Sequence, residues 1–436
     1  TSLTCSRPVP AHTRIVQRFS RRDYSISIRR PTPVSESGLR LPTLTTVGTP
    51  GSKRVLITFG RSFLTLELAR LMSAAGHRVT IVDSIPIGVT RFSHATTSFH
   101  RVPAPKFEPR AYCHALAKIV TDEHIDMVIP IHEETDILSM MVDLFPPECE
   151  LFLSDFDTEN RLHNKFEFQQ LLADKQFQTM KFAQVRGPQD VAGLDFDAPF
   201  ALKECYSRGS QQVHKVMPGD SLDWLAFDPL NPWLAQEWVS GKQYCTYSIV
   251  REGRIHAHAT YPVDYAIGGS SCLNFRSVQH DGIFDWISEF VRDMNFTGQV
   301  GFDFIEHPER GLYCIECNPR ATSGIMMFAP EDRVDRAFFG SNDHVIAPDP
   351  NVDKMIGLGM LLYGWREDSR GDRSLRQFLR DFRRSRDVIS SPGDNRPAVL
   401  LPVAYLGILR SCLKYRVGLA EGFMHDHEWD GLRISE

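Results

Sequence analysis

Short apolar runs alternate with helical patterns in the first part of this chain. The runs are rich in β-branched residues, which is typical of parallel strands buried on both faces. The predicted strands are residues 54–60, 78–83 and 127–131, and the predicted helices are residues 64–76 and 112–123. This alternation predicts a small α/β domain with a parallel, Rossmann-like sheet, which we assign to residues 53–160.

The pattern changes after residue 160. Strands lie closer together, at residues 200–203, 233–239 and 244–250, and Glu252-Gly253 follows as a hairpin turn. We therefore assign an α+β domain to residues 161–335. The sequence from 336 to 436 is amphipathic with helical spacing, and we expect a helical C-terminal region there.

The first 52 residues differ in composition from the rest. Arginines stand among Ser, Thr and Pro, and Asp23 is the only acidic residue before Glu36. Such a segment cannot bury enough apolar surface to offset the entropy of ordering it, so we predict a flexible basic arm and linker. The same composition is typical of an organellar transit peptide, and that alternative stays open.

Composition and charge narrow the class of partner. Of the 436 residues, 42% are hydrophobic and 24% charged, which is ordinary for a globular protein with two or three domains. A net charge of −5 gives no electrostatic reason to expect nucleic acid or an anionic membrane as partner. Nine scattered cysteines favour reduced thiols in an intracellular protein, with the cytoplasm as the expected location. We expect small-molecule chemistry.

The most informative segment is a predicted β-hairpin over residues 298–320. Two runs of alternating apolar residues flank a turn there. If the turn centres between Glu309 and Arg310, the register places Asp303 directly opposite Glu316. Two acidic side chains are then expected within about 5 Å of each other.

A divalent cation is the simplest reason for two opposed acids. Like charges directly opposite would destabilise a plain hairpin. Asn318 shares the face of Glu316, because residues two apart on a strand point the same way. Oxygen ligands of this kind suit Mg²⁺ or Mn²⁺, with nucleotide phosphate completing the shell. Cys314 and Cys317 are three apart, and on a regular strand they would point to opposite faces, so we do not expect them to chelate one ion together.

Candidate phosphate contacts lie upstream. Lys203 ends a predicted strand, and residues 207–210 (Ser-Arg-Gly-Ser) follow as a small loop whose amides could cover phosphates. Lys165 is a second candidate. Taken alone, either lysine is expected at the surface. Only the order of the segments along the chain supports a phosphate-binding role for the two lysines.

That order is the order of an ATP-grasp domain. It runs through Lys165, Lys203 with its loop, residues 236–243, Asp303 and residues 316–320 (Glu-Cys-Asn-Pro-Arg). The chain resembles ATP-grasp ligases over roughly its residues 53 to 330, and in these motifs it is most similar to the carbamoyl-phosphate-synthase and biotin-carboxylase-like branch. The resemblance implies an ATP-grasp fold preceded by a pre-ATP-grasp α/β domain that helps to form the acceptor site.

The resemblance also implies roles for the matching residues. The implied ATP contacts are Lys165 and Lys203 at the phosphates, Ser207, Arg208, Gly209 and Ser210 in the loop over them, Gln236, Glu237 and Val239 along the adenine segment, and Gln243 at the ribose. The implied ligands of two Mg²⁺ ions are Asp303, Glu316 and Asn318. Arg320 would neutralise charge on the transferring phosphoryl group, so that catalysis rests on positioning and electrostatics.

Three departures from the family pattern stand out. Gln243 occupies a position where the family usually has Glu, which keeps a hydrogen bond to the ribose but removes a charge. The phosphate loop has only Gly209 where relatives often have several glycines. No arginine stands two residues before Asp303, which argues against the D-alanine ligase branch.

The implied activity joins a carboxylate to an amine or a thiol through an acyl phosphate, with release of ADP and phosphate. An amino acid or other small carboxylic acid is the expected substrate, and Arg276 is a candidate to grip a carboxylate. A homodimer is left open. Two alternatives remain: a non-catalytic ATP-binding relative, and a nicotinamide-dependent oxidoreductase. The oxidoreductase is weakened because residues 59–64 lack the G-x-G-x-x-G pattern.

Overall fold

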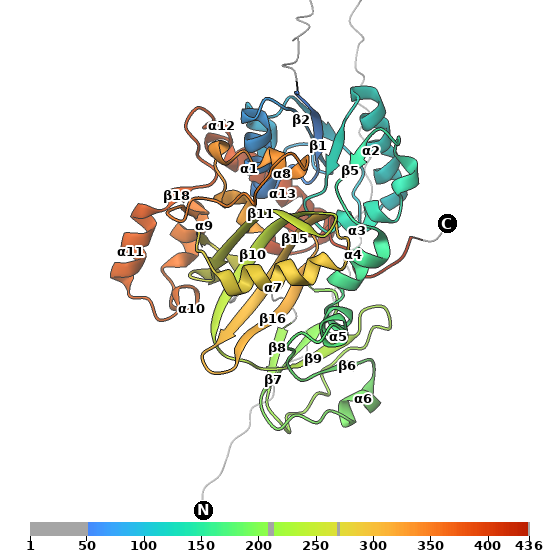
Figure 1. Cartoon of the computed structure of the whole chain (residues 1–436), viewed down its shortest axis with the longest axis vertical. Helices are drawn as coiled ribbons and strands as arrows, with labels where there is room; N and C mark the ends of the chain where they lie inside the picture. The colour runs from blue at the N-terminus through green and yellow to red at the C-terminus, as the bar shows by residue number, and fades with distance from the viewer. Residues whose placement is uncertain (1–50, 208–212, 268–270, 435–436) are drawn as a thin grey trace, which may run out of the picture. The chain divides into compact units, whose positions relative to one another are not determined.

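The computed structural model describes residues 51–207, 213–267 and 271–434, all within one compact unit, Gly48–Glu436. The predicted basic arm and the loop residues Arg208, Gly209 and Ser210 lie outside the described residues. The predicted fold class is confirmed, because a parallel sheet is followed by antiparallel sheets and then by helices (Figure 1). No helix in the described part of the chain is long and apolar enough to cross a membrane.

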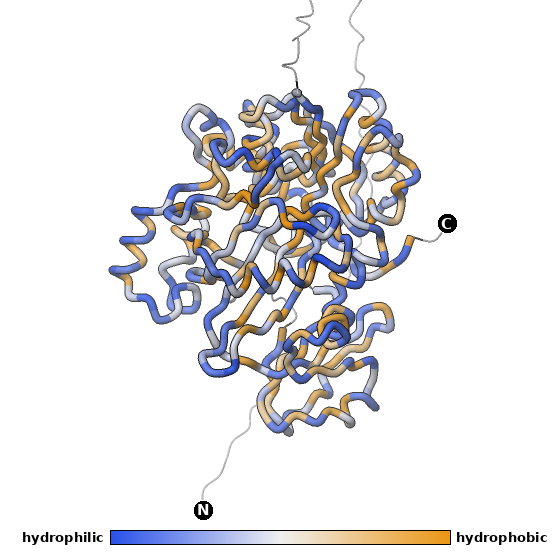
Figure 2. Tube along the Cα trace, in the orientation of Figure 1, coloured by the Kyte–Doolittle hydropathy of each residue, from blue (hydrophilic) through white to orange (hydrophobic). Residues whose placement is uncertain are grey.

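The first sheet is parallel, with strand order β3-β2-β1-β4-β5. Its strands are β1 (Arg54–Ile57), β2 (Arg78–Asp83), β3 (Ser98–Arg101), β4 (Met127–Ile129) and β5 (Glu150–Leu151). Its helices are α1 (Phe63–Ala74), η1 (Val89–Phe92), α2 (Pro109–Glu123), α3 (Glu134–Ser139) and η2 (Val142–Leu144). The three predicted strands and both predicted helices are present, and the hydrophobic residues of Figure 2 concentrate along these strands. The carboxyl ends of β1, β2 and β4 meet at one edge, where open α/β sheets bind ligands.

Two helices lead on to a small antiparallel sheet with strand order β6-β9-β7-β8. These elements are α4 (Phe156–His163), α5 (Lys165–Asp174), β6 (Phe182–Val185), α6 (Pro188–Ala192), β7 (Phe200–Glu204), β8 (Val213–Val216) and β9 (Trp233–Glu237). Asn164 separates α4 from α5, and its side chain accepts hydrogen bonds from the backbone N–H groups of Phe166 and Glu167. This cap fixes Lys165 as the first residue of α5, with its side chain buried.

A larger antiparallel sheet follows, with strand order β11-β10-β15-β16. Its elements are β10 (Lys242–Arg251), β11 (Arg254–Pro262), α7 (Asp281–Arg292), β15 (Gly298–His307) and β16 (Gly311–Asn318). Helix α7 crosses the sheet in Figure 1, and its buried residues Ile287 and Phe290 join one hydrophobic cluster with Phe302 and Phe304 of β15. The other face of β15, which carries Asp303, is thereby left for polar side chains.

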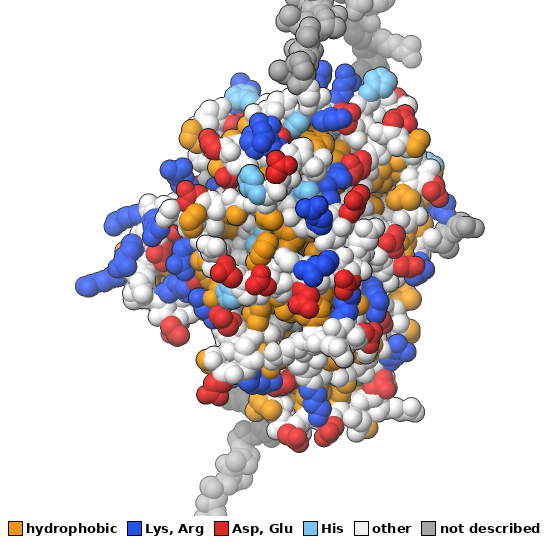
Figure 3. All heavy atoms as spheres, viewed as in Figure 1, with side chains coloured by type: hydrophobic (Ala, Val, Ile, Leu, Met, Phe, Trp, Pro, Cys, Tyr) orange, Lys and Arg blue, Asp and Glu red, His pale blue; other side chains and the backbone are white. Residues whose placement is uncertain are grey.

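The C-terminal region is helical, as expected, but also contributes two short strands. The strands that remain are β12 (Ala266–Ile267), β13 (Ser271–Cys272), β14 (Asn274–Arg276), β17 (Asp353–Met355) and β18 (Arg386–Asp387). The helices are η3 (Ser323–Met327), η4 (Pro330–Asp332), α8 (Asp335–Phe338), α9 (Gly357–Gly359), η5 (Met360–Gly364), α10 (Glu367–Arg370), α11 (Leu375–Arg384), α12 (Arg396–Val399), α13 (Leu401–Tyr415) and α14 (Leu419–Met424). Strands β17 and β18 extend β14 into a small sheet, and basic side chains over α11 are exposed on the face shown in Figure 3.

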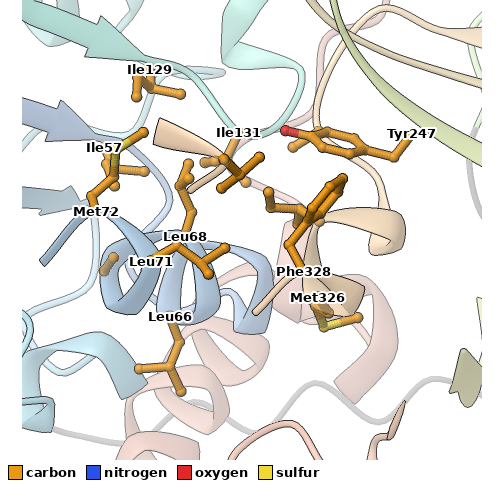
Figure 4. Close-up of a cluster of buried hydrophobic side chains, with 14 of the residues drawn as sticks. Ile57, Leu66, Leu68, Leu71, Met72, Ile129, Ile131, Tyr247, Met326 and Phe328 are labelled. Atoms are coloured by element: carbon orange, nitrogen blue, oxygen red, sulfur yellow. The ribbon is translucent and has the colours of Figure 1, made fainter. Parts of the chain in front are cut away.

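One hydrophobic cluster joins the first sheet to the larger antiparallel sheet. It includes Ile57 of β1, Leu68 of α1, Tyr247 of β10 and Phe328 after η3, all buried (Figure 4). Because α1 contributes to this shared core, the carboxyl edge of the first sheet is held in place beside the antiparallel hairpin.

Candidate active site

The hairpin of β15 and β16 brings two acidic residues together. Asp303 pairs directly with Glu316 across the two strands, as predicted. The predicted turn centre is wrong by half a residue, because His307 pairs with Gly311 and the turn therefore centres on Glu309. Ile315 is an extra residue of β16 and forms a bulge beside Asp303. The bulge shifts the register by one residue, so that Asp303 lies opposite Glu316 despite the different turn centre.

The two carboxylates form an electrostatically strained pair. Burial and the neighbouring charge of Glu316 raise the pKa of Asp303 to about 6. Asp303 is partly buried, and the Glu316 side chain is 22% exposed. Asn318 pairs with Gly301, two positions along, and so shares the face of both acids. A divalent cation fits this arrangement because it removes the repulsion between the two carboxylates.

Asn318 and Arg320 are linked directly. Arg320 Nη2 donates a 3.0 Å hydrogen bond to Asn318 Oδ1, and Arg320 Nη1 lies 3.4 Å from the carbonyl oxygen of Ala321. Within the described residues, Arg320 Nε is buried without a hydrogen-bond partner. An amide oxygen has two lone pairs, so Asn318 can accept from Arg320 and still face a cation. No group of three His, Cys, Asp or Glu side chains that could hold a metal ion occurs in the described ranges.

Two buried lysines face the acids. Lys165 Nζ donates a 2.6 Å hydrogen bond to the carbonyl oxygen of Ser207 and lies 3.6 Å from Glu316 Oε1. Lys203 Nζ donates a 3.1 Å hydrogen bond to the carbonyl oxygen of Ile315. Burial, aided by the charge of Lys165 and opposed by that of Glu316, lowers the pKa of Lys203 to about 8. Two neighbouring ammonium groups that are buried together have the charge and the donors to bind a polyanionic phosphate.

The predicted adenine segment connects the two antiparallel sheets. Gln236 lies on β9 between β6 and β7, is buried, and its amide nitrogen has no partner among the described residues. Glu237 forms a two-pronged ion pair with Arg310 at the hairpin turn, with its shorter bond at 2.6 Å. Val239 is buried beyond the end of β9, and Gln243 is exposed on β10. The ion pair with Arg310 points the Glu237 carboxylate at the hairpin turn.

Not every predicted residue joins this group. Arg276 lies on β14, and its guanidinium donates a 2.9 Å hydrogen bond to Asp264, which also pairs with Arg373. No contact within the described chain links Arg276 to the two lysines or the two acids. The Ser207 side chain bonds to the carbonyl oxygen of Glu204 at 3.1 Å, so its loop begins in a fixed turn.

Sequence reasoning missed a second polar group beside Arg320. Glu133 Oε1 lies 4.0 Å from Arg320 Nη2 and 3.8 Å from His163 Nε2. His163 Nδ1 lies 3.1 Å from Asp136 Oδ2, and Asp136 Oδ1 is buried without a partner in the described ranges. The signal was present, because residues 132–136 (His-Glu-Glu-Thr-Asp) directly follow the predicted strand 127–131 at the functional edge of a parallel sheet.

The edge of the first sheet is closed by a distant segment. Arg61 hydrogen-bonds to Asp83, and its Nη1 donates a 2.9 Å bond to Asp426, with all three side chains buried. Asp83 therefore has its carboxylate occupied by Arg61 and by the backbone N–H of Ile85. A nicotinamide-dependent oxidoreductase would use an acid at this position for a ribose hydroxyl, and the structure gives no support to that alternative.

Comparison with known proteins identifies the family. Residues 162–324 match the ATP-grasp domain, and the sequence matches no curated protein significantly. The fold is similar to N5-carboxyaminoimidazole synthetase from Staphylococcus aureus solved with ADP (TM-score 0.57, 12% identity, 76% of this chain and 96% of that one). It is also similar to biotin carboxylase from Campylobacter jejuni (TM-score 0.53, 13% identity, 70% and 74%) and to L-amino acid ligase from Bacillus licheniformis (TM-score 0.51, 12% identity, 67% and 76%).

Members of this family are ATP-dependent ligases that bind ATP with Mg²⁺. The matched segment contains Lys165, Lys203, Asp303, Glu316 and Arg320, and it ends just beyond the hairpin. From its domain match, its sheet order and this grouping of residues, the chain contains an ATP-grasp domain at residues 162–324.

Proposed function

We propose that this protein is an ATP-dependent ligase that joins a carboxylate to an amine, or to a thiol, through an acyl phosphate. The products are ADP and phosphate, and the activated substrate is an amino acid or another small carboxylic acid. One observation carries the proposal: Lys165 and Lys203 lie beside the opposed acids Asp303 and Glu316. A non-catalytic relative has no need to maintain so costly a group of buried charges.

The chain's residues divide the work of binding. Lys165 and Lys203 hold the α- and β-phosphates, and the loop that begins at Ser207 covers them. The backbone of Val239 meets the adenine edge, and Gln243 meets the ribose. Asp303, Glu316 and Asn318 would hold two Mg²⁺ ions, for which Mn²⁺ could substitute, and the metal would supply positive charge against the nucleotide phosphates.

Arg320 acts at the transferring group. Its unpaired Nε–H and positive charge stabilise the γ-phosphoryl group while a substrate carboxylate oxygen bonds to phosphorus and the bond to the β-phosphate oxygen breaks. ADP leaves in that step. The nucleophile then bonds to the acyl carbon, the bond from that carbon to the phosphate oxygen breaks, and the departing phosphate takes up the proton that the nucleophile loses. Arg276 is a candidate to hold the carboxylate of one substrate.

The proposal is tested by product analysis. Amino acids and small carboxylic acids are screened with MgATP and hydroxylamine, which traps an acyl phosphate as a hydroxamate. We expect at least one acid to give hydroxamate and ADP in equal amounts. AMP and pyrophosphate as the stoichiometric products, or ATP binding without turnover for any acid, would overturn it. Lys203→Met is the matched inactive control, because it retains the length of the side chain but not its charge.

A further inference from the structure

The polar group beside Arg320, which contains Glu133, His163 and Asp136, includes two acidic side chains close to the proposed phosphate site. Glu133 places a carboxylate 4.0 Å from the guanidinium proposed to face the γ-phosphoryl group. A negative charge at that distance opposes the binding of phosphate. The Glu133 carboxylate is explained if the second substrate carries a positive charge and binds at this position.

Glu133 is held from behind. Its Oε2 accepts a 2.9 Å hydrogen bond from the backbone N–H of Trp429, and both residues are buried. The Trp429 ring contacts His163 and Tyr206, with ring centres 6.0 and 5.2 Å apart. Glu133 Oε1 is thereby directed at Arg320 and His163, so that the Glu133 carboxylate has one structural oxygen and one that faces the reaction centre.

His163 and Asp136 form an oriented pair on the same side. His163 Nδ1 lies 3.1 Å from Asp136 Oδ2, and His163 Nε2 lies 3.8 Å from Glu133 Oε1, beyond hydrogen-bonding distance. An acid at Nδ1 fixes the imidazole tautomer that leaves Nε2 as a proton acceptor. Asp136 is 2% exposed, and its Oδ1 has no partner in the described part of the chain. A buried acceptor that lacks a donor indicates a ligand that supplies one.

We propose that Glu133, His163 and Asp136 form the binding and proton-accepting site for the nucleophile, and that this nucleophile is an amine that arrives as an ammonium ion. The inference rests on the proposed function and chooses the amine over the thiol. Glu133 binds the ammonium, and His163 Nε2 accepts one of its protons. The neutral nitrogen then bonds to the acyl carbon, the bond from that carbon to the phosphate oxygen breaks, and the departing phosphate takes up the second proton from the nitrogen. Arg320, whose side chain is 18% exposed, is the most open of these residues and marks the side of approach.

A thiol does not suit the same residues. A thiolate is anionic, and it would meet the carboxylates of Glu133 and Asp136 at the point of attack. Phosphorylated thiol carriers add further negative charge. The acidic lining therefore selects against a thiolate acceptor by the same charges that favour the ammonium.

The test compares three probe nucleophiles on an acid that gives hydroxamate: glycinamide as a cationic amine, N-acetylcysteamine as a thiol, and hydroxylamine, which is uncharged at neutral pH. We expect the wild type to use glycinamide at least tenfold faster than N-acetylcysteamine. Glu133→Gln and His163→Asn should each lower the ratio of the glycinamide rate to the hydroxylamine rate at least tenfold. The exposed acid variant Glu148→Gln is the control and should keep the wild-type ratio.

The outcomes separate the two proposals. Absence of hydroxamate with every acid contradicts the proposed function itself. Hydroxamate formation together with an unchanged ratio in both variants contradicts the amine site, and so does a preference for N-acetylcysteamine. A purely structural role for Glu133 predicts equal losses with glycinamide and hydroxylamine, which also overturns the inference.

Discussion

The ammonium group of Lys165 donates a 2.6 Å hydrogen bond to the carbonyl oxygen of Ser207, the first residue of the loop proposed to cover the phosphates. The same ammonium lies 3.6 Å from Glu316 Oε1. Lys165 therefore touches both the loop and a proposed metal ligand. Its three donors allow it to add a phosphate oxygen to these contacts as the nucleotide enters.

Replacement of Lys165 by Met should weaken nucleotide binding. We expect the Kd values of ADP and of a non-hydrolysable ATP analogue to rise at least tenfold, about 1.4 kcal/mol, in isothermal titration calorimetry. Lys175→Met provides the control, since the ammonium of Lys175 lies 3.7 Å from Asp293 at the surface. Equal affinities of the wild type and Lys165→Met would exclude a phosphate contact at this residue.

Replacement of Glu316 by Ala should separate activity from stability. We expect ADP release to fall below a tenth of the wild-type rate, a barrier increase of more than about 1.4 kcal/mol, because a metal ligand is lost. Without nucleotide, the melting temperature should stay the same or rise, since Asp303 loses the like charge directly opposite it. Glu309→Ala, in the exposed hairpin turn, is the control. Retention of more than a tenth of the activity counts against the metal assignment.

Stability should depend on pH through His258. Burial lowers the pKa of His258 from about 6.5 to about 4, and the ring bonds to Ser248 and Thr260 in its neutral form. Below pH 6.5 the unfolded chain binds a proton that the folded chain excludes, so stability falls as the pH drops from about 6.5 to about 4. The full loss is on the order of 3 to 4 kcal/mol, at about 1.4 kcal/mol per pKa unit.

Urea unfolding at pH 7 and pH 5 measures this effect. His258→Gln should show a smaller drop in unfolding free energy between the two pH values than the wild type. His94→Gln, whose side chain is 55% exposed, should show the full drop. A drop of equal size in His258→Gln would rule out a buried neutral imidazole as the cause.

Residues 1–50 should be dispensable for catalysis, because every proposed site residue lies beyond Lys53. A variant that starts at Ser52 should keep the wild-type kcat/KM within about twofold. Steady-state kinetics and circular dichroism on the purified variant provide the measurement. A higher KM for ATP in a variant that remains folded would instead assign the arm to the active site.

Patterns local in sequence predicted much of this fold. The strand at residues 78–83 has its predicted bounds, and the pairing of Asp303 with Glu316 was predicted from the alternation together with an assumed turn centre. The bulge at Ile315 could not be read from the sequence, because one extra residue leaves the apolar alternation nearly unchanged. The predicted turn was therefore slightly misplaced, although the predicted pair was right.

Contacts between segments that are distant in the chain could not be predicted from the sequence. Glu133 meets Trp429 and Arg320 only because the core around α1 holds the first sheet against the antiparallel hairpin. Neither apolar periodicity nor motif order reports such a contact. Short strands such as β17 were not predicted, because three residues carry too little apolar alternation to be recognised as a strand.

The buried ion pair of Arg61 with Asp426 also constrains how the protein is made. The two residues are 365 positions apart in the chain. At a translation rate of about 5 to 20 residues per second, the ribosome adds Asp426 roughly 20 to 70 s after Arg61. During that interval Arg61 can pair with Asp83, but Asp426 has not yet been synthesised. The edge of the first sheet therefore lacks one of its buried ion pairs during synthesis. That ion pair can form only after Asp426 has left the ribosome.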